Sequence, residues 1–231
     1  MESNILTEIF LPLSLAVIML GMGLSLTIQD FKRITVAPKP VIIGLVNQLI
    51  LLPLIAFILI LVFGLKTELA VGFMILAACP GGATSNLISH LAKGDTALSI
   101  TLTAVTSLIT VLSIPFLVNF AIVRFMPNGE ALQLDIFGTV IAVVIITIIP
   151  VSIGMLIHQF APGFSKLMER PVRILSAVFL ALIILAAILK EKENILEFFR
   201  QAGPVAFLLN IATLAVGFYT SRIFRLPKDQ A

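Results

Sequence analysis

Long apolar segments recur along the whole of this 231-residue chain, and they constrain its fold more than any other feature. A helix needs about 20 apolar residues to cross a bilayer, and only 12% of this chain is charged, about half the share of a soluble domain. The chain therefore predicts a membrane protein with about seven spans and no separate soluble domain. The predicted segments are 7–28, 40–63, 67–91, 96–123, 135–158, 172–189 and 204–224.

All of these segments are predicted to be helical. An open strand edge is not tolerated in lipid, and the segments are too long for barrel strands. The first segment has no basic stretch before it and no small-residue cleavage site, so we expect it to stay in the mature chain. The fold class is thus an all-α polytopic membrane protein.

The basic residues predict the orientation, because loops rich in Lys and Arg stay in the cytoplasm. One alternate set of loops carries Lys32, Arg33, Lys39, Lys93, Lys166, Arg170, Arg173, Arg222, Arg225 and Lys228. The other set carries only Lys66, Arg124, Lys190, Lys192 and Arg200. We therefore expect an inner or plasma membrane protein with its amino terminus outside and a cytoplasmic tail at 226–231.

Several other classes of function are disfavoured by composition. The basic residues lie in short loops rather than on one face, which argues against nucleic acid as a partner. One cysteine and two histidines are too few for a disulfide framework or a transition-metal site. An intramembrane enzyme with Cys79 or Ser85 as nucleophile needs a base at the same depth, and His90 lies about two turns further along the helix. No charged residue lies in the central third of any segment, which disfavours proton coupling.

The third segment is interrupted. Its first half, 67–78, spans about 18 Å as a helix, and Pro80, Gly81 and Gly82 follow at once. Proline removes a backbone donor and glycine is a poor helix former, so we expect the helix to break here and to resume at Ala83. The alternative is a continuous helix with a proline kink and a packing role.

A break inside the membrane is tolerated only beside protein or a wet cavity. It leaves the carbonyl groups of the first half facing a cation and the amides of Gly82, Ala83 and Thr84 facing an anion. Ser85 and Asn86 lie one step beyond the break. This pattern predicts a binding site for small ions rather than a catalytic centre.

A polar stripe on the next helix supports this interpretation. Its members follow one another at spacings of three and four residues, which places them on one helix face. Such hydroxyls often bond only to their own helix or pack against a neighbour. Neutral oxygens gathered in a dry cage otherwise suit a hard cation such as sodium. The stripe comprises Ser99, Thr103, Thr106, Thr110 and Ser113.

Asn47 and Gln48 lie near the middle of the second apolar segment, with Pro53 one turn further on. A buried amide in hydrocarbon requires a polar partner. Two interpretations stay open at this point: contact with another helix, or a ligand that faces a cavity.

The run from Ala78 to Ser107 closely resembles the signature of the bile acid:sodium symporter family, and Met19–Arg33 and Gly44–Pro53 resemble its flanking helices. The resemblance implies two inverted repeats, each with a broken helix, in which a panel of helices moves against a core. Panel helices would lie in 1–39 and 135–190. Core helices would lie in 40–124 and 203–225, with the broken helix at 67–91.

The resemblance also implies the ligands. One sodium site would use Ser85, Asn86, Ser99 and Thr103, and Gln48 would belong to a second. An organic anion would lie beside Gly82, Ala83, Thr84 and Asn86. Sodium would be the coupling ion, and no organic cofactor is expected.

The implied function is sodium-coupled symport of an organic anion, such as a bile acid, a pantothenate-like acid or a 2-oxo acid, by alternating access. Family members continue past the point where this sequence ends, so we expect a C-terminally truncated form. The alternative function is therefore a sodium-binding membrane protein without transport activity of its own, or one that associates with a second copy.

Overall fold

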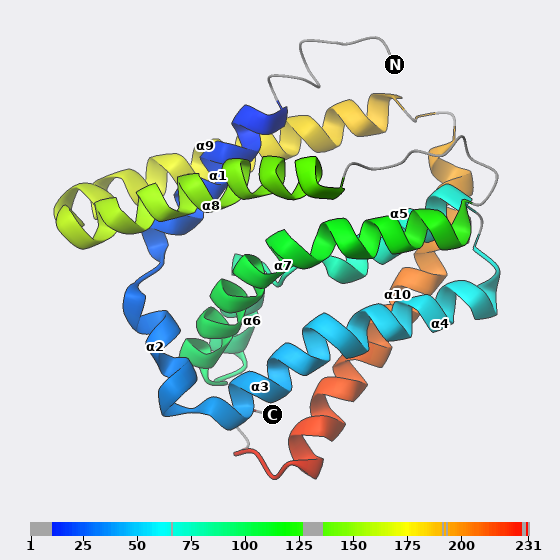
Figure 1. The fold of residues 1–231 in the computed structure, drawn as a ribbon, viewed down its shortest axis with the longest axis horizontal. Coiled ribbons are helices and arrows are strands. Elements are labelled where there is room, and N and C mark those ends of the chain that lie inside the picture. The colour runs from blue at the N-terminus through cyan, green and yellow to red at the C-terminus, as the bar shows by residue number, and fades with distance from the viewer. Residues whose placement is uncertain are drawn as a thin grey trace. The chain divides into compact units, whose positions relative to one another are not determined.

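The computed structural model describes residues 11–65, 67–126, 136–190, 192, 194–227 and 230. Within these ranges the chain forms helices and no strands (Figure 1). This confirms the predicted all-α class. The helices are α1 (Leu11–Ser25), α2 (Ile28–Val36), α3 (Pro38–Val46), the π-helix η2 (Asn47–Leu51), α4 (Leu52–Phe63), α5 (Thr67–Ala78), α6 (Ala83–Leu91), α7 (Thr96–Phe125), α8 (Ile136–Phe160), α9 (Pro162–Lys190) and α10 (Ile195–Ile223).

Five helical runs in the described residues are long and apolar enough to cross a membrane. A sixth is formed if α1 and α2, which are bent by 75° at their junction, count as one span. The interrupted third segment contributes α5 and α6, each shorter than a bilayer crossing. The polytopic architecture is thus confirmed, and the count of about seven spans stays a prediction.

The last two helices begin ahead of the apolar segments that predicted them. α9 starts at Pro162 rather than Val172, and α10 starts at Ile195 rather than Pro204. Lys166 and Arg170 precede the apolar run of α9, and Glu197, Arg200 and Gln201 precede that of α10. These residue types are good helix formers, so each helix begins before its apolar run. The predicted starts at Thr7 and Asp135, and the loop charges of Lys66 and Lys228, lie outside the described residues.

The chain divides into two compact units, residues 1–28 with 137–195 and residues 29–136 with 196–231. The first unit contains α1, α8 and α9. Here α1 packs along α9, and a Cβ atom on Gly21 would lie 2.9 Å from Cγ1 of Val172. The end of α1 is held by α8 and α9, because His158 Nδ1 lies 2.6 Å from the carbonyl oxygen of Leu24 and Ser165 donates to the same oxygen over 3.0 Å.

α1 and α8 also cross in backbone contact. A Cβ atom added to Gly23 would lie 2.2 Å from the carbonyl oxygen of Val151, and one added to Gly154 would lie 2.6 Å from that of Leu20. Only residues without a side chain allow two helix backbones to approach so closely. The two glycines therefore define where these helices cross.

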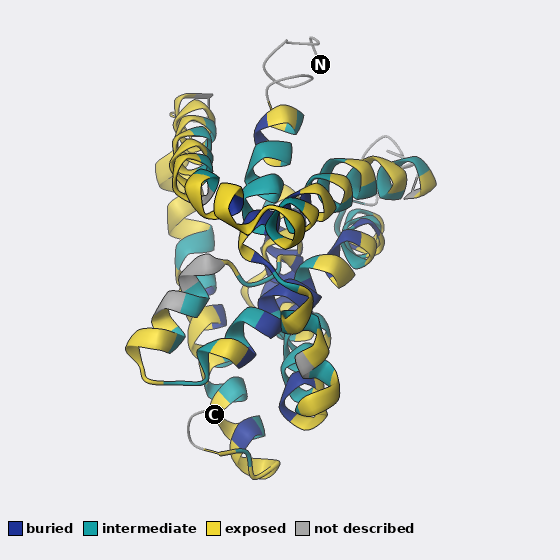
Figure 2. Cartoon of the chain, turned by 90° about the vertical axis from the view of Figure 1, so that its left-hand side faces the viewer, coloured by how far each residue is buried: buried dark blue, intermediate teal, exposed yellow. Residues whose placement is uncertain are grey.

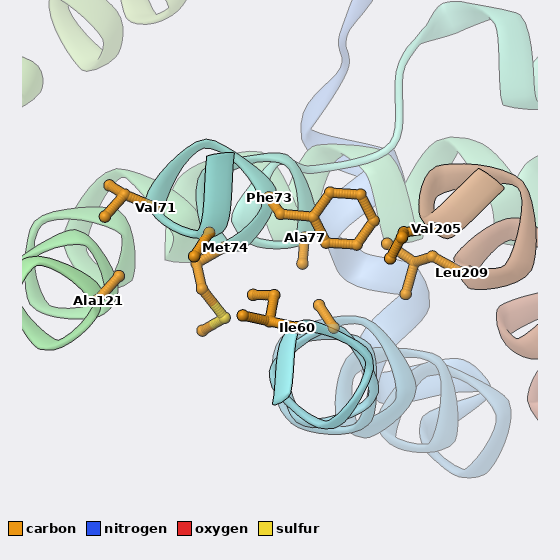
Figure 3. Close-up of a cluster of buried hydrophobic side chains, with 10 residues drawn as sticks. Ile60, Val71, Phe73, Met74, Ala77, Ala121, Val205 and Leu209 are labelled. Carbon is orange, nitrogen blue, oxygen red and sulfur yellow. The ribbon is translucent and has the colours of Figure 1, made fainter. Parts of the chain in front are cut away.

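The second unit is built around α5, which packs against α4 and α7. Its core also includes side chains of α10: Phe73 of α5 lies toward Val205 and Leu209, and Met74 lies toward Ile60 of α4 (Figure 3). α6 and α3 both pack against α7. This packing holds both halves of the interrupted segment against the same long helix.

Large apolar side chains cover much of the outer surface. Most of α9 is exposed, and α8 is half-buried or exposed along nearly all of its length; yellow, exposed residues cover much of the chain in Figure 2. Phe137, Phe160 and Leu167 are among the more exposed residues. A soluble protein rarely exposes apolar surface on this scale. These helix faces are suited to contact with lipid.

Candidate functional site at the helix break

The interrupted segment is broken where the sequence predicted. α5 ends at Ala78, α6 begins at Ala83, and Gly82 between them is extended, with φ −104° and ψ 177°. Neither Gly81 nor Gly82 has a positive φ. The glycines therefore act through their low helix propensity and small size rather than through a left-handed conformation.

The proline is not sufficient to explain this break. Four other prolines, Pro115, Pro150, Pro171 and Pro204, lie inside helices that continue through them. The Gly-Gly pair that follows Pro80 is the difference, since none of those four is followed by two glycines. The alternative of a kinked continuous helix is thus wrong at Pro80.

Asn86 of α6 is the centre of a polar cluster with α7. Its side-chain oxygen Oδ1 accepts hydrogen bonds from Ser99 Oγ over 2.7 Å and from Thr103 Oγ1 over 3.3 Å. The sequence had placed these three residues in one site, and the structure brings them together. Thr103 is buried, and Asn86 and Ser99 are half-buried.

The rest of the polar stripe does not reach the break. Thr106 donates to the carbonyl oxygen of Leu102 and Thr110 to that of Ser107, both within α7. Ser113 Oγ is buried and has no hydrogen-bond partner among the described residues. Thr106 and Thr110 therefore bond only within their own helix, as such hydroxyls often do. Of the five hydroxyls of the stripe, those of Ser99 and Thr103 contact Asn86.

Ser85 lies on the same side of the break. Its hydroxyl donates to the carbonyl oxygen of Gly82 over 2.6 Å, so in this structure its proton is engaged within the first turn of α6. A Cβ atom on Gly81 would lie 3.4 Å from Ser85 Oγ and 3.7 Å from Thr103 Oγ1. The absence of a side chain at Gly81 thus leaves the approach to both hydroxyls open.

Asn47 and Gln48 take different partners. Gln48 Nε2 donates over 2.9 Å to the carbonyl oxygen of Cys79, which lies in the break itself. Asn47 Nδ2 donates over 2.8 Å to Thr220 Oγ1 on α10. The sequence left two interpretations open for these amides. Asn47 contacts another helix, and Gln48 contacts the backbone of the break.

The start of α6 is the other end of the site. No side chain caps this N-terminus, whose backbone amides carry a partial positive charge. The side chains of Ala83 and Thr84 lie outside the described part of the chain, so only the backbone is placed there. The break thus combines neutral oxygens on one side with amide donors on the other.

Sequence reasoning missed two partners, the carbonyl of Cys79 and the hydroxyl of Thr220. Every residue has a carbonyl, so no sequence signal could single out Cys79. Thr220 is 173 positions from Asn47, and its spacing to other polar residues forms no pattern.

A polytopic all-α protein with a discontinuous helix, and with polar groups gathered at the break, has the architecture that many secondary transporters use to bind ions and substrates. Comparison with known proteins agrees. The model of the sodium bile acid symporter family matches residues 12–198. The chain belongs to this family, whose members are transporters rather than enzymes.

Three relatives show the extent of the similarity. An uncharacterized sodium-dependent transporter of Bacillus subtilis, YocS, is 30% identical over 96% of this chain and 68% of its own length. A probable chloroplastic sodium/metabolite cotransporter of rice, BASS2, is 30% identical over 94% of this chain and 50% of its own. The ileal sodium/bile acid cotransporter of rabbit is 27% identical over 97% and 64%. The chain thus spans between half and about two thirds of these relatives.

Replacing both glycines of the break is expected to disrupt the site. Gly81→Ala with Gly82→Ala favours helix by about 2 kcal/mol, which is about 30-fold in an equilibrium. We expect stabilisation by NaCl, measured as a thermal shift against KCl, to be lost. Gly217→Ala on α10 is the control, since a Cβ atom there meets nothing within 4 Å. An unchanged sodium response in the double variant would show that the break is not needed.

Proposed function

We propose that this chain binds sodium and an organic anion at the α5–α6 break and acts as a sodium-coupled symporter. The observation that carries the proposal is the meeting of Ser99 Oγ and Thr103 Oγ1 at the side-chain oxygen of Asn86. These three oxygens come from two packed helices, so no large rearrangement is needed to direct them at one ion. Ser85 supplies a further hydroxyl beside them.

Sodium fits this set better than a transition metal or calcium does. Hydroxyl and amide oxygens are hard neutral ligands, whereas transition metals prefer imidazole or thiolate. Calcium usually requires carboxylates, and none of the four residues has one. The names of the relatives, which include sodium-dependent transporter and sodium/bile acid cotransporter, support the same ion.

Gln48 and the carbonyl of Cys79 are proposed to contribute to a second sodium site. Both groups lie at the break, and the amide of Gln48 has an oxygen as well as the nitrogen that now donates to Cys79. A rotation of this amide presents that oxygen to a cation. The same movement frees the carbonyl of Cys79.

The anion is proposed to bind at the start of α6, beside Gly82, Ala83, Thr84 and Asn86. Uncapped amides at a helix N-terminus attract a carboxylate or sulfonate. The substrate class is an organic anion such as a bile acid, a pantothenate-like acid or a 2-oxo acid. The rabbit relative is named for bile acid and the rice relative for a metabolite.

Alternating access is proposed to move panel helices against a core. The division of the chain into two compact units supports this, since the second unit contains the break and all of the proposed ligands. The panel would comprise 1–39 and 135–190, although contacts group residues 29–39 with the second unit. The proposed orientation, from the loop charges, has the amino terminus outside the cell.

Uptake into proteoliposomes tests the proposal. Vesicles with purified protein and an inward sodium gradient should accumulate a labelled bile acid, pantothenate or pyruvate, and an equal potassium gradient should not drive it. Thermal stabilisation by sodium without any accumulation would favour the alternative, a sodium-binding membrane protein that does not transport alone. The absence of both responses would contradict sodium binding altogether.

A further inference from the structure

Thr220 on α10 contacts the residue next to Gln48, and we propose that it positions Gln48 at the helix break. Thr220 Oγ1 accepts a hydrogen bond of 2.8 Å from Asn47 Nδ2. The adjacent Gln48 donates to the carbonyl oxygen of Cys79 over 2.9 Å. This inference rests on the proposed function, because it concerns how the break responds to sodium.

Thr220 determines which group donates and which accepts in its hydrogen bond with Asn47. Its hydroxyl lies 2.7 Å from the carbonyl oxygen of Val216 and 3.1 Å from that of Gly217, both in its own helix. Its single proton is therefore engaged within α10, and the hydroxyl presents a lone pair to Asn47. Asn47 must turn its NH₂ group, not its oxygen, toward α10.

The π-helix makes the two neighbouring amides act together. The amide of Leu52 donates to the carbonyl of Asn47, five residues back, and Pro53 has no amide hydrogen to offer. Neighbouring residues on one helical turn have fixed directions relative to each other, so the contact of Asn47 with α10 sets the rotation of this turn. That rotation directs Gln48 toward Cys79.

The two contacts differ in their surroundings. The Asn47–Thr220 hydrogen bond is partly buried, whereas the Gln48–Cys79 bond lies at an exposed place in the chain. A long, flexible glutamine beside an open break keeps one direction only if its backbone is held. Thr220 is therefore a positioning residue: it acts through Asn47 and does not itself belong to the ion site.

Thr220→Val tests the inference, since valine keeps the shape of threonine and removes the acceptor. We expect the sodium concentration at half-maximal thermal stabilisation to rise about threefold to tenfold, in detergent at constant total NaCl plus KCl. Thr220→Ser keeps the hydroxyl and should restore the wild-type value. Thr213→Val is the control, because the Thr213 hydroxyl donates to the carbonyl of Asn210 within α10.

A double-mutant cycle with Gln48→Ala decides whether Thr220 acts through Gln48. If it does, Thr220→Val raises the sodium midpoint of the wild-type protein but has no further effect when Gln48 is alanine. The same rise in both backgrounds, or no rise in either, overturns the inference. Asn47→Val removes the same hydrogen bond from the other side and replaces Thr220→Val if that variant does not fold.

A sodium-free measurement separates this inference from the proposed function. Cys79 is the single cysteine of the chain and is exposed in it. With Gln48 released from its carbonyl, Cys79 should react faster with a maleimide in KCl alone, in Thr220→Val but not in Thr213→Val. If the wild-type protein shows no thermal shift with sodium, the proposed function fails. If all variants are labelled at the same rate, the positioning role of Thr220 is overturned, whatever the sodium response.

Discussion

Asn86→Leu is expected to remove the response to sodium while leaving the protein folded. The substitution deletes the oxygen at which Ser99 and Thr103 meet. A hydrogen bond to a charged group contributes about 1.5–3 kcal/mol. If the contact of this oxygen with sodium is of the same size, its loss lowers the affinity about 10- to 150-fold. The measurement is the sodium concentration that gives half of the thermal stabilisation, together with sodium-driven uptake.

In KCl, without sodium, the midpoint of thermal unfolding of this variant should stay close to that of the wild-type protein. The freed hydroxyls of Ser99 and Thr103 can donate to carbonyl groups of α7 instead. Hydrogen bonds between membrane helices average about 0.6 kcal/mol. Asn119→Leu is the matched control: Asn119 is a half-buried asparagine of α7 with no hydrogen bond among the described residues. Asn86→Asp keeps an oxygen and should retain a sodium response. Equal sodium responses of Asn86→Leu and Asn119→Leu would place the ion elsewhere.

The helix break was predictable because its cause is local. Pro80, Gly81 and Gly82 all disfavour helix, and their effects act on the same few residues of backbone. The contacts of Asn86 with Ser99 and Thr103 were predictable for a related reason. A short turn joins α6 to α7, and the spacing of the hydroxyls places them on one face of the next helix.

Contacts between distant segments were not predictable in the same way. Asn47 and Gln48 were recognisable as amides that need partners, but the sequence could not assign Thr220 to one and Cys79 to the other. Both amides lie in the π-helix Asn47–Leu51, which ends two residues before Pro53, and no sequence pattern predicted this π-helix. Single residues far apart in sequence leave no periodic signal, so only the fold reveals them.

The close crossing of α1 and α8 was likewise hidden. Gly23 and Gly154 are single glycines inside apolar helices, which on sequence alone are only weak helix formers. Their function becomes visible from the space around them, where the backbone of the other helix occupies the position of a side chain.

Gly23→Ala is therefore expected to destabilise the unit formed by α1, α8 and α9. The new Cβ atom would lie 2.2 Å from the carbonyl oxygen of Val151 and 2.9 Å from its Cα atom. These are backbone atoms, so no change of rotamer relieves the overlap and one helix must move. Overpacking of this kind costs about 1–3 kcal/mol and sometimes more, and we expect the upper end, seen as a lower midpoint of thermal unfolding in detergent.

The overlap cannot be absorbed easily by a shift of α1, because α1 is held at two further places. Gly21 packs against Val172 of α9, and the carbonyl of Leu24 is bound by α8 and α9. Gly163→Ala in the first turn of α9 is the control: a Cβ atom there meets nothing within 4 Å, so alanine should leave the midpoint of thermal unfolding close to the wild-type value. If Gly23→Ala were as stable as Gly163→Ala, α1 and α8 would not be in backbone contact at Gly23.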